Sequence, residues 1–217
     1  MTMKLFTYFR SQASYRVRIA LNLKGLKRED TFLHLEHGDQ YAAGYKKLNP
    51  QAVVPTLLDG DHKLFQSLAI LEYLDETHPN PPLLPKDALS RAWVRGLALI
   101  NVADSHPLIV PRVRNYLSNT LKVSDEQRLA WIQHWLALGL EAMETLLAEH
   151  TESGQFCHGD APTMADICLV TQVFPARMFK VKLEPYRRAL RIYESCMAIP
   201  AFADAAPPKQ PDAEKAA

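Results

Sequence analysis

One stretch, residues 49–72, constrains the fold of this chain more than any other part of it. It holds an apolar run, an Asp59-Gly60 turn, a second short apolar run and then a periodic segment that begins at Ser67. Two apolar runs joined by Asp-Gly predict a β-hairpin, and a serine before a periodic segment predicts a helix N-cap. The stretch therefore predicts a hairpin followed directly by a helix.

Pro55 is unusual because it stands inside the first predicted strand. Proline cannot donate to a sheet ladder, so we expect it at an edge strand, with a cis Val54-Pro55 bond as one way of placing it at the strand's start. The N–H and C=O of Val54 can then pair with an extended peptide, and Gln66-Ser67 at a helix N-terminus can hold a carboxylate. Together they predict a site for a small acidic peptide. The alternative is an ordinary hairpin followed by an ordinary capped helix.

The residues before the hairpin predict a β-α-β unit. Short strands are expected at 3–8 and 31–35, a helix ending at Lys24-Gly25 between them, and a short helix at 41–48 after them. With the hairpin and the helix that starts at Ser67, the order becomes β-α-β-α-β-β-α. This order is typical of a thioredoxin-like fold, in which helices cover both faces of a mixed four-stranded sheet.

A proline cluster at 79–85 predicts a domain boundary, because proline blocks helix and stiffens a linker. We expect a thioredoxin-like domain at 1–80, an all-helical domain at 86–206 and a flexible, proline-rich tail at 207–217. Segments with helical spacing lie at 87–120, 125–150, 163–178 and 185–197. Thr163, followed three residues later by Asp166, predicts a capping box at the start of the third of these.

Composition excludes several classes of partner. The 217 residues include 25 basic and 24 acidic side chains, a net charge of +1, which gives no electrostatic reason to expect nucleic acid or a membrane. No apolar run has the length of a signal peptide core or a membrane span. The three cysteines have no metal-like spacing, so we expect reduced structural thiols, no metal site and a cytoplasmic protein.

The chemistry is expected at the junction between the first strand and the first helix. Arg10, Ser11 and Ser14 would bring a cation and two hydroxyls to a helix N-terminus, where N–H groups and the helix dipole favour an anion such as a thiolate. The alternative is that one serine is simply the N-cap and the arginines of this segment are solvated.

Both stretches resemble one known family. Val54-Pro55 and Gln66-Ser67 resemble the glutathione-binding elements of the cytosolic glutathione transferases. The segment from Ser11 to Leu21 resembles the zeta-class motif Ser-Ser-Cys-x-x-Arg-Val-Arg-Ile-Ala-Leu, with Gln12 and Ala13 in place of the second serine and the cysteine. The zeta class contains the maleylacetoacetate isomerases and, as close relatives, the maleylpyruvate isomerases. The resemblance implies a glutathione transferase fold, glutathione as cofactor and a homodimer.

The resemblance also implies roles for individual residues. Ser11 and Ser14 would be thiolate donors, with Ser11 preferred, and Arg10 would stabilise developing charge. An arginine expected near the end of the 163–178 segment aligns with Met178, so Arg177 either replaces it or one carboxylate contact is lost. The implied glutathione-binding residues are Val54, Pro55, Gln66, Ser67, Asp104 and His106, and the implied substrate-binding residues are Arg10, Arg112 and Arg177.

The activity implied by this resemblance is glutathione-dependent cis–trans isomerisation of a maleyl keto acid, as in the breakdown of aromatic amino acids. The thiolate would add to the cis double bond, and its expulsion after rotation would leave the trans, fumaryl product. The sequence leaves maleylacetoacetate and maleylpyruvate both open as substrates. General conjugation of small electrophiles to glutathione and a non-catalytic binding protein with this fold are the alternative functions.

Overall fold

The structure, a computed structural model, describes residues 2–213. The chain divides into two compact units, Met1–Leu83 with Ile199–Ala217, and Leu84–Ala198. The expected boundary inside the proline cluster lies close to this division, and the Asn80-Pro81 bond within the cluster is cis. No helix among the described residues is both long and apolar enough to cross a membrane.

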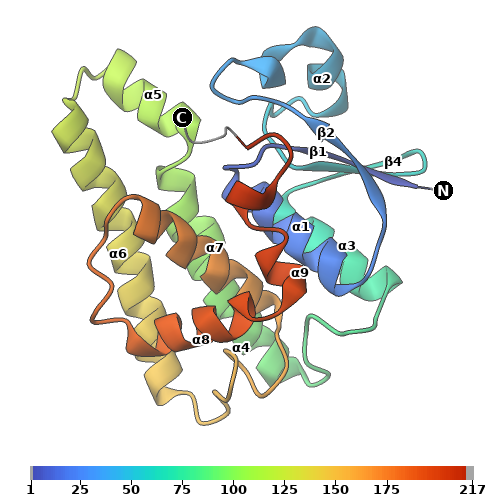
Figure 1. Cartoon of the computed structure of the whole chain (residues 1–217), viewed down its shortest axis with the longest axis vertical. Coiled ribbons are helices and arrows are strands. Elements are labelled where there is room, and N and C mark those ends of the chain that lie inside the picture. Colours follow the sequence, from blue (N-terminus) through green and yellow to red (C-terminus); the bar gives the residue numbers. More distant parts are fainter. Residues whose placement is uncertain (1, 214–217) are drawn as a thin grey trace. The chain divides into compact units, whose positions relative to one another are not determined.

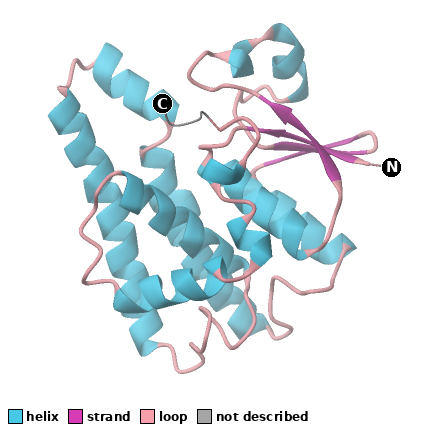
Figure 2. Ribbon diagram, in the orientation of Figure 1, coloured by secondary structure: helices cyan, strands magenta, loops and turns pink. Residues whose placement is uncertain are grey.

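The first unit is built on a mixed four-stranded sheet (Figure 2). Its strands are β1 (Met3–Thr7), β2 (Arg28–Phe32), β3 (Thr56–Asp59) and β4 (His62–Phe65). They are ordered β2-β1-β3-β4, and only the β1–β2 pair is parallel. This confirms the predicted hairpin and the thioredoxin-like sheet.

Helices cover both faces of this sheet. Helices α1 (Gln12–Leu23) and α3 (Ser67–Thr77) lie side by side on one face (Figure 1). On the other face, Tyr45 of α2 (Ala43–Leu48) packs against Phe6 of β1, with ring centroids 5.4 Å apart. Because alternate residues of a strand point to opposite faces, β1 has apolar neighbours on both sides.

Two expectations about the strands were wrong. The second strand begins at Arg28 rather than at residue 31. It is an edge strand, and its Arg28 and Asp30 form a partly buried ion pair 2.9 Å long, so the two charges compensate each other. Pro55 does not lie in an edge strand. It precedes β3, which is flanked by β1 and β4, so the missing N–H falls outside the ladder.

The C-terminal segment belongs to the first unit, which corrects the expected helical domain of 86–206. Helix α9 (Pro200–Ala203) packs on α1, where Tyr15 donates to the carbonyl of Phe202 at 3.4 Å. The tail was expected to be flexible, but Pro207–Lys209 form a 3₁₀ turn and Asp212 accepts a 2.9 Å hydrogen bond from the N–H of Phe9. These contacts join positions about 200 residues apart, which local composition does not reveal. Residues 214–217 lie outside the described residues.

The second unit is helical, as predicted. The α-helices are α4 (Ala88–Leu99), α5 (Pro111–Asn119), α6 (Asp125–Glu149), α7 (Met164–Met178) and α8 (Arg187–Met197). The segment expected to be helical at 87–120 forms two α-helices, α4 and α5. Between them lie a π-helical stretch at Ile100–Ser105 and a 3₁₀ turn at His106–Leu108. Pro107 and Pro111 explain the interruption, because proline removes a helical donor.

The predicted capping box at Thr163 is present at the start of α7 and is fully buried around Asp166. The Asp166 carboxylate accepts from the N–H of Thr163 at 2.7 Å, from its hydroxyl at 2.9 Å and from the N–H of Cys157 at 2.7 Å. Each of the three cysteines is buried, and the described residues contain no disulfide bond. Burial raises the pKa of the Cys157 thiol far above its ordinary value. They are therefore inert thiols, as expected.

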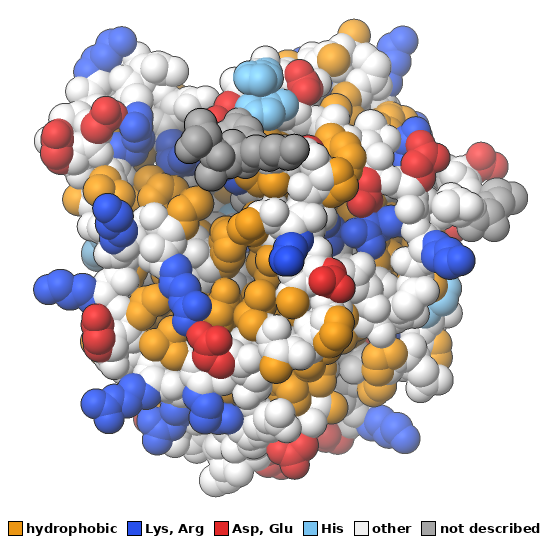
Figure 3. Space-filling view, viewed as in Figure 1, with side chains coloured by type: hydrophobic (Ala, Val, Ile, Leu, Met, Phe, Trp, Pro, Cys, Tyr) orange, Lys and Arg blue, Asp and Glu red, His pale blue; other side chains and the backbone are white. Residues whose placement is uncertain are grey.

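The surface carries charges of both signs. On the face drawn in Figure 3, Lys and Arg side chains are interspersed with Asp and Glu, and hydrophobic side chains lie between them. This mixture agrees with the net charge of +1.

Candidate functional site

The first candidate feature is the N-terminus of α1, where Ser11 is the N-cap. Its Oγ accepts a 3.2 Å hydrogen bond from the N–H of Ser14, and its own N–H donates to the carbonyl of Tyr8 at 3.0 Å. Since Oγ acts as acceptor in the cap, the hydroxyl hydrogen is left to donate to another group. The half-buried Ser11 can thus cap the helix and also donate to an anion in front of it.

Ser14 lies one turn further and is fully buried. Among the described residues, nothing forms a hydrogen bond with its Oγ, and that atom has almost no accessible surface. A ligand sulfur could reach this hydroxyl only if neighbouring atoms moved. The geometry therefore favours Ser11 over Ser14 as the donor to an external thiolate.

The three arginines of this segment differ sharply. Arg10 is exposed, forms a 3.5 Å ion pair with Glu36 and places its guanidinium 4.9 Å from the Phe9 ring. Arg16 and Arg18 are buried, so the alternative of solvated arginines is wrong for both of them. Of the three, Arg10 is the one that offers its charge to solvent beside the start of α1, and water screens that charge.

Arg18 holds the chain that leads into α1. Its guanidinium donates to the carbonyls of Tyr8 at 3.2 Å and Phe9 at 3.0 Å, and its Nε donates to the carbonyl of Ala205 at 3.1 Å. Burial lowers the pKa of Arg18 to about 10, so it stays charged at neutral pH. A charged, hydrogen-bonded arginine thereby fixes the backbone just before Ser11.

The second feature is the loop before β3, which contains the cis Val54–Pro55 bond. The carbonyl of Val53 accepts from the Tyr45 hydroxyl at 2.6 Å and from the Asn49 side chain at 2.9 Å, and these two bonds fix the loop. Within the described chain, no hydrogen bond involves the N–H or C=O of Val54. Unpaired backbone groups of this kind can accept an added peptide strand.

The third feature is the start of α3. Its N-cap is Gln66 rather than Ser67, which corrects the expected cap by one residue. Gln66 has φ 67°, uncommon for a residue other than glycine, and its side chain donates to that of Gln51 at 2.9 Å. The N–H groups of the first turn of α3 are therefore not capped by a Gln66 side chain, which leaves them suited to bind an anion.

Ser67 is supported by Arg16, a residue for which the sequence predicted no role in this site. The buried Arg16 donates through Nε to the Ser67 Oγ at 3.0 Å. The oxygen of the buried Ser67 is therefore an acceptor inside the protein, which leaves its hydrogen available to donate to a further group. Arg16 also places a positive charge under the N-terminus of α3. The Arg-Val-Arg run was visible in the sequence, but nothing in it distinguished a buried arginine from an exposed one.

The remaining predicted site residues lie in the second unit. Asp104 is exposed at the end of the π-helical stretch, and His106 is half-buried in the 3₁₀ turn that follows. Arg112 is exposed in the first turn of α5. Arg177 is exposed near the end of α7, ion-paired with Glu194, and its guanidinium lies 4.4 Å from the ring of Tyr193. Arg177 would have to leave this ion pair to hold a substrate carboxylate.

Fold and site together define a class of protein. A thioredoxin-like sheet, a cis-proline loop whose Val54 backbone has no partner among the described residues, and an uncapped helix start are features of a glutathione transferase. Residues 1–76 match the family described as Glutathione S-transferase, N-terminal domain.

Relatives that match nearly the whole chain show which class of glutathione transferase it belongs to. A probable maleylacetoacetate isomerase of Vibrio cholerae is 44% identical over 98% of this chain and 99% of its own length. A maleylpyruvate isomerase of Ralstonia sp. is 43% identical over 97% of this chain and 99% of its own. A similar solved structure is that of maleylacetoacetate isomerase from Methylobacterium extorquens AM1 with bound malonate and glutathione. It superposes on this chain with a TM-score of 0.95 and is 42% identical in sequence. The match covers 98% of this chain and 100% of that one. The chain belongs to the zeta class of the glutathione transferases.

Proposed function

We propose that this chain is a glutathione-dependent isomerase that converts a maleyl keto acid into its fumaryl isomer. The observation that carries the proposal is the hydroxyl of Ser11, which caps α1 and keeps its hydrogen for a ligand. Support comes from relatives named maleylacetoacetate isomerase and maleylpyruvate isomerase, which match nearly the whole chain. A place in the breakdown of aromatic compounds and a cytoplasmic location remain predictions.

The first unit has the groups that glutathione requires. The unpaired N–H and C=O of Val54 fit the backbone of its cysteinyl residue, and the cis bond to Pro55 sets the loop's direction. The γ-glutamyl carboxylate fits the start of α3, where Gln66 and Ser67 lie above the charge of Arg16. These two features provide partners for the cysteinyl backbone and the γ-glutamyl carboxylate of glutathione.

Bound glutathione would supply a thiolate that adds to the maleyl double bond and leaves after rotation. The task of the protein is to keep that sulfur ionised, because a free thiol with a pKa of about 8.5 is only a few per cent thiolate at neutral pH. Ser11 donates a hydrogen bond to the anion, and the positive end of α1 adds a favourable field. A hydrogen bond to a charged group contributes about 1.5–3 kcal/mol, equivalent to about one to two pKa units.

The carboxylates of the substrate need cations. We propose Arg10 for this role in the first unit, and Arg112 for it in the second, because planar guanidinium groups bind carboxylates with two parallel hydrogen bonds. Arg177 is the weaker candidate because its ion pair with Glu194 is much closer than the 3.5 Å pair of Arg10 with Glu36. Asp104 and His106 remain predicted contacts of glutathione.

Turnover of the two candidate substrates tests the proposed function. Maleylacetoacetate and maleylpyruvate are each mixed with the protein, with and without glutathione, and formation of the fumaryl product is followed by absorbance. We expect turnover only when glutathione is present, and the faster substrate identifies the physiological keto acid. Conjugation of an aryl halide without isomerase activity would favour a general transferase, and glutathione binding without either activity would favour a binding protein.

Replacing Ser67 tests the proposed glutathione site. Ser67→Ala is expected to weaken glutathione binding by about 1–3 kcal/mol, because it removes one donor from a charged acceptor and leaves the buried Arg16 without its serine partner. Isothermal titration calorimetry measures this affinity. Unchanged affinity in Ser67→Ala would remove this residue from the site.

Ser118 of α5 supplies the matched control for this test. Like Ser67, it accepts a hydrogen bond from an arginine, in this case from Arg128 at 2.6 Å. It was not predicted to contact glutathione, so Ser118→Ala should bind glutathione as the wild type does. Equal weakening in both variants would show that loss of a serine–arginine contact, rather than loss of a ligand contact, causes the effect.

We also propose that the protein is a two-fold homodimer, as the resemblance to the zeta class implies. Symmetric association of identical chains is the commonest form of oligomer among soluble proteins. Light scattering at micromolar concentration should give twice the mass of the 24.5 kDa chain. A monomeric mass under these conditions would reject the dimer.

A further inference from the structure

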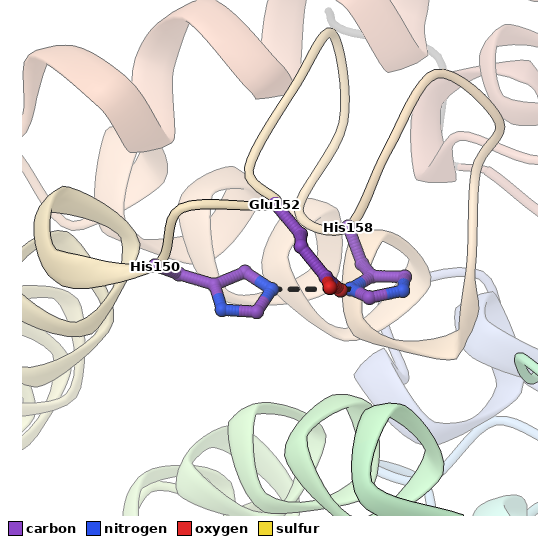
Figure 4. Close-up of side chains that lie close together, drawn as sticks. All are labelled: His150, Glu152 and His158. Carbon is purple, nitrogen blue, oxygen red and sulfur yellow. Dashed lines mark hydrogen bonds and ion pairs between the residues drawn. The ribbon is translucent and has the colours of Figure 1, made fainter. Parts of the chain in front are cut away.

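The loop between α6 and α7 brings together three side chains that play no part in the proposed isomerase. His150 ends α6 as its C-cap, and Glu152 and His158 follow in the loop. Figure 4 shows the two imidazole rings facing each other through one nitrogen each, with the carboxylate of Glu152 reaching the same point. The three ligand atoms lie within 4.8 Å of one another.

The distances between these atoms fit a shared metal ion. Nε2 of His150 is 3.1 Å from Nδ1 of His158, which in turn is 3.4 Å from Oε2 of Glu152. Ligands about 2.0–2.1 Å from a tetrahedral Zn²⁺ ion lie about 3.3 Å from one another. The side chain of Glu152 is 61% exposed, so it can turn to complete the triangle without disturbing the core.

The loop is held in place before any ligand binds. The N–H of Gly159 donates to the carbonyl of Glu152 at 2.7 Å, and the N–H of Ser153 donates to the carbonyl of His150 at 3.0 Å. Arg191 of α8 donates to the carbonyl of Gly154 at 2.8 Å. The three ligand residues are therefore held close together before a metal ion binds, which lowers the entropy cost of binding the ion.

A neighbouring ring holds one of the two imidazoles in place. The indole of Trp93, from α4, stacks on the His150 ring with centroids 3.6 Å apart and planes 12° apart. This contact fixes the orientation of the ring, and with it the direction in which the ring nitrogen faces His158.

We propose that His150, Glu152 and His158 bind one divalent transition-metal ion of the Zn²⁺ type. Two imidazole nitrogens and one carboxylate oxygen are a donor set that zinc accepts, and the fourth position would remain open to water. The ion would link the end of α6 to the loop that precedes the buried capping box of α7. No metal site was expected from the sequence, because its cysteines lack metal-like spacing and these three ligands follow no familiar motif.

Calorimetric titration with Zn²⁺ tests this site. The tag-free chain is used without chelator and without glutathione, whose thiol would itself bind zinc. We expect one saturable equivalent of Zn²⁺ in the wild type and at least a tenfold loss of affinity in Glu152→Gln and in His158→Gln. His37→Gln serves as the control, because it alters a separate pair of neighbouring histidines, His34 and His37, whose stacked rings have centroids 3.6 Å apart. This variant should bind the same single equivalent of Zn²⁺ as the wild type.

Two further measurements test whether a variant has lost metal binding through misfolding and whether cysteine side chains bind the metal ion. Thermal unfolding should show a rise in Tm with Zn²⁺ for the wild type and for His37→Gln, and a smaller rise at the same Zn²⁺ concentration for the exposed substitution Glu152→Gln. Co²⁺ in place of Zn²⁺ should give the visible bands of a tetrahedral nitrogen and oxygen site without a thiolate charge-transfer band. Absence of a saturable equivalent in the wild type, an unchanged Zn²⁺ affinity in His158→Gln or in Glu152→Gln, or a thiolate band would each overturn the proposal.

Discussion

Ser11→Ala should raise the pKa of bound glutathione by about one to two units, back towards about 8.5, and lower turnover at pH 7 about 8- to 25-fold. The physical reason is the double use of the Ser11 hydroxyl, whose oxygen accepts from Ser14 N–H while its hydrogen stays available to a thiolate. Without that donor, less of the cofactor is ionised at neutral pH. The thiolate absorbance band, titrated against pH, measures the change.

The loss of turnover in Ser11→Ala should be largest at low and neutral pH. A raised thiol pKa reduces the thiolate fraction at low and neutral pH, and the fraction recovers once the pH exceeds the new pKa. Turnover by Ser11→Ala should therefore approach that of the wild type as pH rises. Ser11→Thr keeps a hydroxyl that can cap the helix and donate, so it should retain more activity than the alanine variant.

Ser14→Ala is the matched control in the same turn of the helix. Its buried Oγ has no partner among the described residues, so its removal should change the thiolate pKa less. An unchanged pKa in Ser11→Ala with a raised one in Ser14→Ala would reverse the assignment of the two serines. If neither variant changed the pKa, stabilisation of thiolate by serine would be refuted.

Asp166→Ala should lower the free energy of unfolding by about 3–5 kcal/mol, among the largest effects of any single substitution outside the site. Three donors converge on this buried carboxylate, and each loses its acceptor in the variant. At about 2–4 °C per kcal/mol for a chain of this size, the fall in Tm would be about 6–20 °C. Differential scanning calorimetry measures it, and Asp166→Asn, which keeps the shape, should be affected less.

The chain contains its own control for this prediction. Ser124 and Gln127 form the same reciprocal capping box at the start of α6, but both are exposed. Ser124→Ala should cost only about 1 kcal/mol, because water can satisfy the freed N–H groups. Equal losses in Asp166→Ala and Ser124→Ala would contradict the argument that burial makes the α7 box critical.

The sequence by itself determined those features that depend on neighbours along the chain. The Asp59-Gly60 turn predicted the hairpin of β3 and β4, and the segment from Ser67 to Thr77 is the helix α3. The capping box of Thr163 was also readable, since its two partners are three residues apart. Resemblance in short motifs around Ser11 and Pro55 was enough to indicate the zeta class, to which the chain belongs.

Only the tertiary structure decided which polar groups are buried and what they contact. Arg16 and Arg10 look alike in the sequence, yet one is buried against Ser67 and the other faces solvent. The tail that composition predicted to be flexible is bound through Asp212 to Phe9. Burial and long-range hydrogen bonds depend on which segments pack together, and that packing is set by the whole fold rather than by residue type. The sequence did not reveal the cluster of His150, Glu152 and His158 for the same reason: only the folded loop brings these three side chains together.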